Sequence, residues 1–289
     1  MRGASTAPGA DVRPAIVGVV NVTPDSFSDG GRFLEPMAAR AHVDRLLDEG
    51  ADVVEIGGES TRPAGATYGA GATKVDAATQ IARIRPVIEY AVRERRALVA
   101  VDTTLVEVAE AALDAGATIV NDVSTLGDVA LARLVAARGA WLVLMHARPG
   151  ADSKYDDVIA EVAREWSAAR DRAVAAGLDP ARIVMDPGLG FGKGGDDNLR
   201  ILAGLARFHA LVGPHPIYVG ASRKAFIGLC EERAALPKSR PDGRIGGTVA
   251  ACLVAVSAGA AALRVHDVQA TRQALAVATA IDIQREEMR

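Results

Sequence analysis

The sequence contains little cysteine, no long apolar segment and no excess of basic charge. Its 289 residues include two cysteines, Cys230 and Cys252, in apolar segments without a partner motif, so we expect reduced core thiols and a cytoplasmic location. No apolar run approaches the ~20 residues that cross a bilayer, so we expect no membrane partner. The formal net charge of −3 and the lack of a basic stripe argue against nucleic acid as a partner.

Several catalytic motifs are also missing, and each absence argues against a class of mechanism. Without HExxH or a Cys/His cluster, tightly held zinc is not expected. Without GxSxG, and with neither cysteine following a strand, covalent nucleophilic catalysis lacks a candidate. No GxGxxG follows the first expected strand, which argues against a dinucleotide cofactor. The segment DPGLGFGKG is not a Walker A loop, because Pro187 replaces its first glycine and Gly194 follows Lys193.

The chain is expected to form one domain after a short tail. Residues 1–13 lack the apolar core of a signal peptide, so we interpret them as a disordered N-terminal tail. Residues 14–289 contain no linker, charge run or low-complexity tract. A chain of this length can bury roughly 75% of its unfolded surface, and α/β barrels commonly run to ~250 residues as one domain.

A repeated Gly-Ala pair is the clearest regularity. It follows an amphipathic run and precedes a short aliphatic run at Gly50, Gly116, Gly139 and Gly259. Glycine in the left-handed conformation ends helices, and the short runs suit buried strands. Eight strand–helix units predict a single-domain α/β fold, the (β/α)8 TIM barrel, with an open doubly wound sheet as the alternative. The expected strands are 15–20, 52–56, 98–102, 117–121, 141–146, 182–186, 216–220 and 262–265, and the expected helices are 36–49, 76–95, 105–115, 128–138, 156–176, 195–207, 244–258 and 267–284.

Polar residues gather where the expected strands end. Active sites of parallel barrels lie at the carboxyl ends of the strands and in the loops that follow them. One such residue could merely close the barrel with hydrogen bonds, but a barrel needs no ring of them on one rim. The ring consists of Asn21, Asp25, Thr61, Arg62, Asp102, Asn121, His146, Asp186, Lys224, Arg264 and His266.

Two loops after the first strands carry further candidates. The segment GVVNVTPDSFSDGG contains Phe27 and too many special residues for a simple surface turn, so it predicts a substrate lid. The segment GGESTRP places Thr61 beside Arg62, whose guanidinium suits phosphate oxygens. A salt bridge from Arg62 to Glu59 is the alternative for this arginine.

The rim residues divide into two kinds of chemistry. Asp102, Asn121 and Asp186 suit the hydrogen-bonding edge of a planar heterocycle. Phe191 adds an aromatic face, and the glycines around it allow a flat ligand close to the backbone. An electropositive group suits a diphosphate with Mg²⁺, since magnesium prefers oxygen ligands and keeps waters and phosphate oxygens. This group is Asn21, Thr61, Arg62, Arg264 and His266.

Eight segments together resemble the dihydropteroate synthase family of pterin-binding TIM barrels. The resemblance runs from about residue 14 to the C-terminus, and the segments occur in the family's order. They are NVTPDSFSDGG, GGESTRP, VDT (101–103), NDVS (121–124), LMH (144–146), DPGLGFGK, SRKAFIG (222–228) and RVHDV (264–268).

The resemblance implies a transferase of folate biosynthesis. It would join (7,8-dihydropterin-6-yl)methyl diphosphate to 4-aminobenzoate by way of a pterin cation, releasing pyrophosphate. The implied roles follow the matched positions. Catalytic residues would be Asp102, Asp186, Lys224, Arg264 and His266; substrate-binding residues would be Thr61, Arg62, Pro63, Phe27, Asn121, Met145, Phe191, Ser222 and Arg223; and Asn21 would bind Mg²⁺. The family also implies a homodimer, for which the Ala-rich helices 244–258 and 267–284 offer small-residue faces, and a sulfonamide target.

The sequence departs from the family pattern in two loops. The segment after Pro63 is longer than usual, and the loop after His146 is shorter. Ala225 also stands where serine is common, which bears on the sulfonamide response. The altered loops keep a non-catalytic pterin-binding paralogue open as an alternative. A pterin-dependent methyltransferase, a further alternative, would not need the electropositive residues Arg62, Arg264 and His266.

Overall fold

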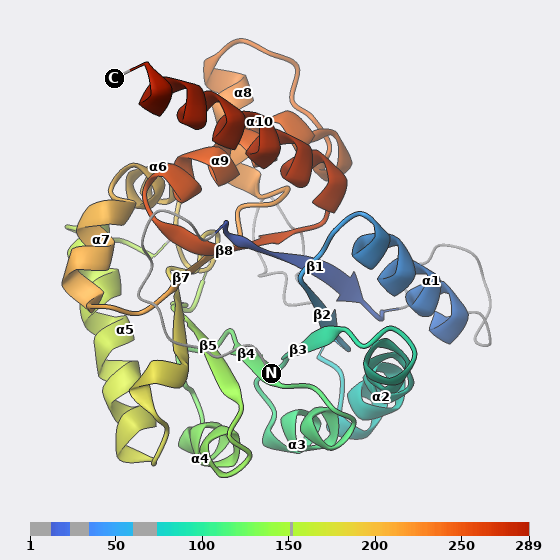
Figure 1. The fold of residues 1–289 in the computed structure, drawn as a ribbon. Helices are drawn as coiled ribbons and strands as arrows, with labels where there is room; N and C mark the ends of the chain where they lie inside the picture. Colours follow the sequence, from blue (N-terminus) through green and yellow to red (C-terminus); the bar gives the residue numbers. More distant parts are fainter. Residues whose placement is uncertain (1–12, 24–34, 60–73, 151–152, 289) are drawn as a thin grey trace.

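The structure is a computed structural model of the chain and describes residues 13–23, 35–59, 74–150 and 153–288. Eight parallel strands form a closed barrel in the order β1 to β8, and helices surround it (Figure 1). This confirms the (β/α)8 barrel and excludes the open sheet. The strands are β1 (Ala15–Asn21), β2 (Val53–Gly57), β3 (Leu98–Asp102), β4 (Ile119–Asp122), β5 (Trp141–Met145), β6 (Ile183–Asp186), β7 (Ile217–Val219) and β8 (Ala260–Val265).

The helices lie outside the strands and alternate with them along the chain. Of the described helices, none is long and apolar enough to cross a membrane. Residues 1–12, which include most of the expected tail, lie outside the described part of the chain. The helices are α1 (Glu35–Asp48), α2 (Ala77–Arg93), α3 (Val106–Asp114), α4 (Val129–Ala137), α5 (Val158–Ala175), α6 (Gly195–Ala203), α7 (Leu205–Val212), α8 (Ala225–Arg233), α9 (Ile245–Ser257) and α10 (Val268–Glu287).

The glycines of the repeated Gly-Ala pairs end their helices as expected. Gly50, Gly116, Gly139 and Gly259 all have positive φ, from +59° to +107°. After three of them, Gly50, Gly116 and Gly139, the alanine N–H bonds back to the last helical turn, as in Ala51 N–H to Leu46 O at 2.9 Å. Glycine adopts this conformation without the steric penalty of a Cβ, so each pair turns the chain from a helix into the next strand.

Two helical features differ from the sequence prediction. The helix expected over 195–207 is two helices, α6 and α7, because the chain bends at Gly204. A Cβ at Gly204 would lie 2.2 Å from Ile159 Cδ1, so a larger residue there would require the Ile159 side chain to shift. Helix α8 was not predicted, since it buries only Phe226, Ile227 and Gly228 and therefore shows no long apolar stripe.

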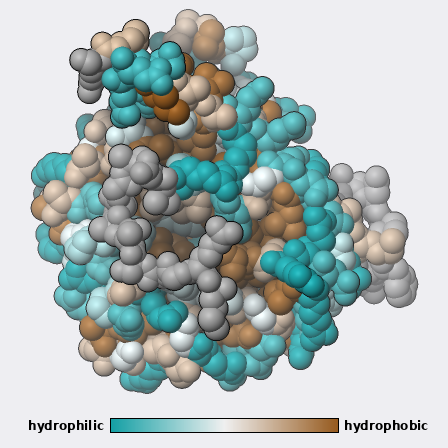
Figure 2. Space-filling view, viewed as in Figure 1, coloured by the Kyte–Doolittle hydropathy of each residue, from teal (hydrophilic) through white to brown (hydrophobic). Residues whose placement is uncertain are grey.

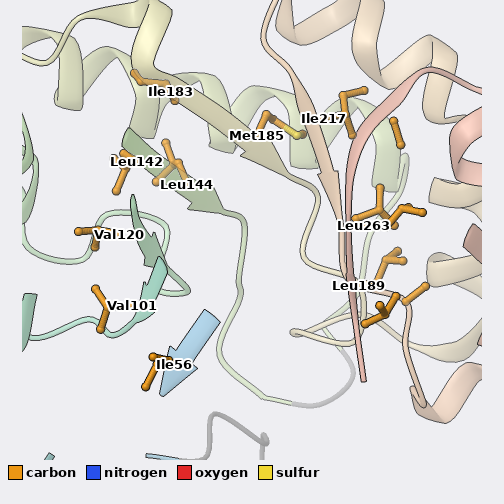
Figure 3. Packing of buried hydrophobic residues seen from close by; sticks show 14 of the residues in the cluster. Ile56, Val101, Val120, Leu142, Leu144, Ile183, Met185, Leu189, Ile217 and Leu263 are labelled. Atoms are coloured by element: carbon orange, nitrogen blue, oxygen red, sulfur yellow. The ribbon is translucent and has the colours of Figure 1, made fainter. Parts of the chain in front are cut away.

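Two separate layers of apolar side chains hold the barrel together. The larger layer lies between the strands and the helices, where the outward side chains of β2 to β8 gather (Figure 3). The smaller layer fills the barrel interior, with one side chain from each of the eight strands. Its members are Val17, Val53, Ala100, Ile119, Val143, Val184, Tyr218 and Ala262.

Candidate active site

The polar residues of the site form the next layer of the barrel interior. Side chains alternate along a strand, so a residue two positions beyond an interior residue faces the interior as well. The next interior residue of each strand lies two positions beyond the interior apolar layer, toward the carboxyl end. These residues are mostly polar. They include five residues predicted from the sequence, Asp102, Asn121, Met145, Asp186 and Arg264, and one that was not predicted, Glu55.

Glu55 is the centre of this layer. It is 1% exposed and accepts hydrogen bonds from Asn121 Nδ2 at 3.0 Å and from the Tyr218 hydroxyl at 2.8 Å. Arg264 Nε donates to its other oxygen, and Arg264 Nη2 donates to Asp102 Oδ2 at 3.0 Å. One buried carboxylate therefore fixes side chains from β4, β7 and β8. The alternation in VVEIG, with Glu55 on the same face as Val53, was the sequence signal that could have identified it.

The network leaves two buried acceptors without a partner. Within the described residues, Asp102 Oδ1 and Asn121 Oδ1 have no hydrogen-bond donor. Because Glu55 takes the Asn121 amide N–H, the amide oxygen is the atom left over. A buried unsatisfied acceptor costs about 1–3 kcal/mol, so native proteins rarely keep one without a function. The pair is suited to N–H donors of a ligand.

Burial raises the pKa of two carboxyl groups in this layer, those of Asp102 and Asp186. The pKa of Asp102 rises to about 7, because burial outweighs the nearby Arg264 guanidinium. Burial also raises the pKa of Asp186, against the attraction of Lys224. The pKa of Arg264 is raised instead: burial lowers it, but the Glu55 and Asp102 carboxylates outweigh that effect. The guanidinium is therefore a permanent positive charge in the barrel mouth.

Lys224 and Phe191 meet beside Asp186. The Lys224 ammonium lies 4.5 Å from the centre of the Phe191 ring and donates to Leu189 O. Burial lowers the pKa of Lys224 to about 8, while Asp186 acts in the opposite direction. The structure thus places a cation, an aromatic face and a carboxylate at one end of the mouth.

The loop after Asp186 passes close to the backbone of β5. Gly188 has φ +68°, and a Cβ there would lie 1.8 Å from His146 O. Its N–H donates to Asp186 Oδ1 at 2.7 Å. His146, part of the predicted rim, is buried, and its Nε2 lies 2.9 Å from Glu165 Oε2. Burial lowers the pKa of His146 to about 4, so at neutral pH this histidine is an uncharged part of the loop support.

His266 and Ser222 form the electropositive end with Arg264. The Ser222 hydroxyl accepts the His266 backbone N–H at 3.2 Å and lies 3.0 Å from His266 Nδ1. The serine proton is therefore free to be donated to Nδ1, which leaves the ring proton on Nε2 as a donor. Burial, together with Arg264 and Arg223, lowers the pKa of His266 to about 3. Arg223 itself makes a two-point ion pair with Asp267.

The remaining predicted residues lie at the first two strands. Asn21 ends β1 beside Gly57, and its Oδ1 would be 3.7 Å from a Cβ at that glycine. No group of three or more His, Cys, Asp or Glu residues that could hold a metal ion is found among the described residues. Glu59 accepts from Val75 N and Gln80 Nε2. Asp25, Phe27, Thr61, Arg62 and Pro63 lie outside the described residues.

The chain is similar to known proteins over most of its length. A family model described as "Pterin binding enzyme" matches residues 17–266. Dihydropteroate synthase of Mycobacterium leprae (strain TN) is 44% identical over 269 residues, which is 91% of each chain. Dihydropteroate synthase of Xanthomonas albilineans, solved with 4-aminobenzoic acid, is 45% identical with a TM-score of 0.85 over 93% of both chains. A second structure of that enzyme, with 7,8-dihydropteroate, is 41% identical with a TM-score of 0.81 over 93% of this chain and 94% of that chain.

Proposed function

The chain belongs to the pterin-binding enzyme family, and from this premise we infer that it catalyses the dihydropteroate synthase reaction, a transferase step of folate biosynthesis. It joins (7,8-dihydropterin-6-yl)methyl diphosphate to 4-aminobenzoate and yields 7,8-dihydropteroate and pyrophosphate. One structural observation carries this conclusion. Asp102 Oδ1 and Asn121 Oδ1, which have no donor in the part of the chain that the structure describes, share a barrel mouth with the Arg264 guanidinium.

We propose that the carboxylates and amide read the edge of the pterin. Asp102, Asn121 and Asp186 would accept hydrogen bonds from its N–H groups, while Phe191 and Met145 line its flat faces. A buried acceptor that loses its donor is left unsatisfied, so heterocycles without matching N–H groups are rejected. Lys224, held between Leu189 O and the Phe191 ring, would add a positive charge at this end.

The diphosphate would bind at the electropositive end, which adjoins the pterin acceptors through the bond from Arg264 to Asp102. Arg264 provides a fixed charge, and His266 and Ser222 provide neutral donors. Mg²⁺ fits the donor chemistry here as an ion shared with the substrate, because Asn21 offers a single amide oxygen and magnesium takes phosphate oxygens and water for its other positions. When bound with the diphosphate, the ion would neutralise negative charge on the leaving group.

The chemical step needs no covalent intermediate with the protein. The C–O bond between the pterin methylene and the diphosphate breaks, with its electron pair going to the diphosphate, and the resulting cation is shared with the pterin ring. The 4-aminobenzoate nitrogen then forms the C–N bond and loses a proton. The residues of the electropositive end stabilise the negative charge as it develops on pyrophosphate. We also propose that Thr61, Arg62, Pro63, Phe27 and Phe191 surround the arylamine. The arylamine site formed by these residues would then also be the target of sulfonamides.

We further propose a homodimer in the cytoplasm. Helices α9 and α10 pack on each other, and five of their large apolar side chains are at least 40% exposed, namely Ile245, Val254, Val277, Ile281 and Ile283. Figure 2 shows hydrophobic side chains among the hydrophilic ones over the C-terminal helices. Both cysteines are free thiols, which supports a reducing compartment. A monomer in analytical ultracentrifugation at micromolar concentration would contradict the dimer.

A pyrophosphate-release assay tests the function directly. Purified protein with both substrates and Mg²⁺ should release pyrophosphate and form dihydropteroate; no product above background would refute the proposal.

Asp186→Ala should abolish pterin binding in calorimetry, because it removes an edge acceptor, and unchanged affinity would contradict that assignment. Tight binding without turnover would instead favour a non-catalytic paralogue. Methyl transfer from a methylated pterin would favour the methyltransferase alternative.

A further inference from the structure

Lys193 is a buried lysine for which the proposed reaction provides no role. Its side chain belongs to the loop that follows β6, and the residue is 3% exposed. The ammonium nitrogen lies 2.9 Å from Gly188 O, 2.9 Å from Phe191 O and 3.3 Å from His146 O. It also lies 2.9 Å from His146 Nδ1. A single cation thus faces four acceptors, three of them backbone carbonyls.

The loop that Lys193 contacts is intrinsically difficult to order. Gly188, Gly190 and Gly192 have φ of +68°, +79° and +66°, so every second residue is a glycine in the left-handed region. Glycine loses more conformational freedom on ordering than any other residue. Such a loop keeps one shape only if specific bonds hold it, and carbonyls bound to a buried ammonium are charge-assisted bonds of the stronger kind.

The same loop carries the groups that face the pterin end of the site. Gly188 N–H is bonded to Asp186, Leu189 O accepts from Lys224, and the Phe191 ring lies against the Lys224 ammonium. Lys193 holds the carbonyls of Gly188 and Phe191, and therefore fixes the peptides on both sides of the Leu189 contact. Displacement of these carbonyls would move the Phe191 ring and release Lys224.

A chain of charges behind Lys193 holds the ammonium in place. His146 Nδ1 accepts from Lys193, so the ring proton sits on Nε2 and is donated to Glu165. Glu165 is paired in turn with Arg148. The charged groups that act on Lys193 are Asp186 and Lys224 from the site and Arg148 and Glu165 from behind it. Burial lowers the pKa of Lys193 to about 7; Lys224 and Arg148 act in the same direction, and the carboxylates of Asp186 and Glu165 oppose it.

We propose that Lys193 is a positioning residue of the pterin site, which acts by holding the Gly188–Gly192 loop so that Asp186, Phe191 and Lys224 keep the arrangement that binds the heterocycle. The proposal rests on the pterin-binding function proposed above. Lys193 touches no substrate in this account, and the diphosphate end of the site does not depend on it.

The experiment compares Lys193→Met with Lys238→Met, a matched change at an exposed lysine. Lys193→Gln, which keeps a hydrogen-bond donor, is the milder variant if the methionine variant fails to fold. Calorimetry with 6-hydroxymethyl-7,8-dihydropterin should show affinity lowered about tenfold or more in Lys193→Met, the effect of losing one good hydrogen bond. Affinity for pyrophosphate with Mg²⁺ should stay within about twofold, and Lys238→Met should match the wild type in both.

Hydrogen exchange in the ligand-free protein provides the second readout. The amides of Gly188, Gly190 and Phe191 are bonded to Asp186, Asn198 Oδ1 and Gly188 O, so their exchange is slow while the loop is held. Exchange of residues 188–191 should accelerate in the Lys193 variants while the strands stay protected. Unchanged pterin affinity, or equal losses of pterin and pyrophosphate affinity, would overturn the proposal. A wild-type protein that binds no pterin would refute the proposed function, and exchange of the loop would still show whether Lys193 orders it.

Discussion

Replacement of Asp102 by asparagine is expected to stabilise the protein while removing pterin binding. The carboxyl group is 5% exposed, and burial raises its pKa to about 7 despite the Arg264 guanidinium 3.0 Å away. Asparagine has the same shape and no charge. It therefore removes an ionised group that the fold accommodates poorly, and it replaces one of the two acceptors that face the ligand with a donor.

The magnitude follows from the two pKa values. Raising the pKa from 3.8 to about 7, at about 1.36 kcal/mol per pH unit, lowers the free energy of unfolding by on the order of 4 kcal/mol once Asp102 is ionised. Below pH 3.8 the carboxyl is neutral in both states, and there is no penalty. Between pH 3.8 and about 7 the unfolded chain releases its proton first, so the stability of the folded state falls; above about 7 the penalty is constant.

Urea unfolding of wild type and Asp102→Asn at pH 5, 6, 7 and 8 tests this reasoning. The stability advantage of the variant should grow from pH 5 to pH 7 and then level off, reaching a few kcal/mol. Asp171→Asn, at an exposed aspartate that forms an ion pair with its neighbour Arg170, is the matched control and should show no such trend. A variant that is no more stable than wild type at pH 8, or an advantage that does not depend on pH, would refute the argument.

Three further changes test other parts of the site. Gly188→Ala should destabilise the folded protein severely and prevent pterin binding, because its Cβ would overlap His146 O; near-normal calorimetric binding would contradict the described loop. Tyr218→Phe should lower the free energy of unfolding by about 1.5–3 kcal/mol in urea titrations, since Glu55 loses one of its buried donors, and an unchanged midpoint would show that this bond contributes nothing. Lys224→Met should remove an inflection near pH 8 from the profile of kcat/KM for the pterin substrate, because burial lowers the pKa of Lys224 to about 8, and an unaltered profile would assign that inflection elsewhere.

Local patterns in the sequence were sufficient to predict the barrel. The Gly-Ala pairs mark the point where a helix ends and a strand begins, and the short aliphatic runs give the strands within one or two residues. These signals depend on neighbouring residues only, through the left-handed glycine and the alternation of a strand. The break between α6 and α7 at Gly204 was missed because an isolated glycine does not by itself end a helical pattern. The close approach of Ile159, 45 residues earlier in the chain, is not visible in any local pattern either.

In the site, too, local patterns predicted some residues, and residues that depend on distant contacts were missed. Asp102, Asn121, Asp186 and Arg264 could be predicted because each is a polar residue at the end of an apolar strand. Glu55 also occupies such a position, but its importance comes from partners on three other strands, which become neighbours only when the barrel closes. Lys193 stands in a glycine-rich segment that resembles a phosphate loop. The sequence around it therefore gave no indication that its ammonium binds backbone carbonyls.

The partners of Glu55 are far apart in the chain, and this determines when the pocket can exist during synthesis. Tyr218 follows Glu55 by 163 residues, and Arg264 follows it by 209. A nascent chain that has left the ribosome only as far as β6 carries Asp102, Asn121 and Asp186, but of the three donors to the buried glutamate it has only Asn121 and lacks the Tyr218 hydroxyl and the Arg264 guanidinium. Binding competence is therefore among the last properties that this protein acquires, and a bound pterin indicates that Arg264 of β8 has reached Glu55 of β2.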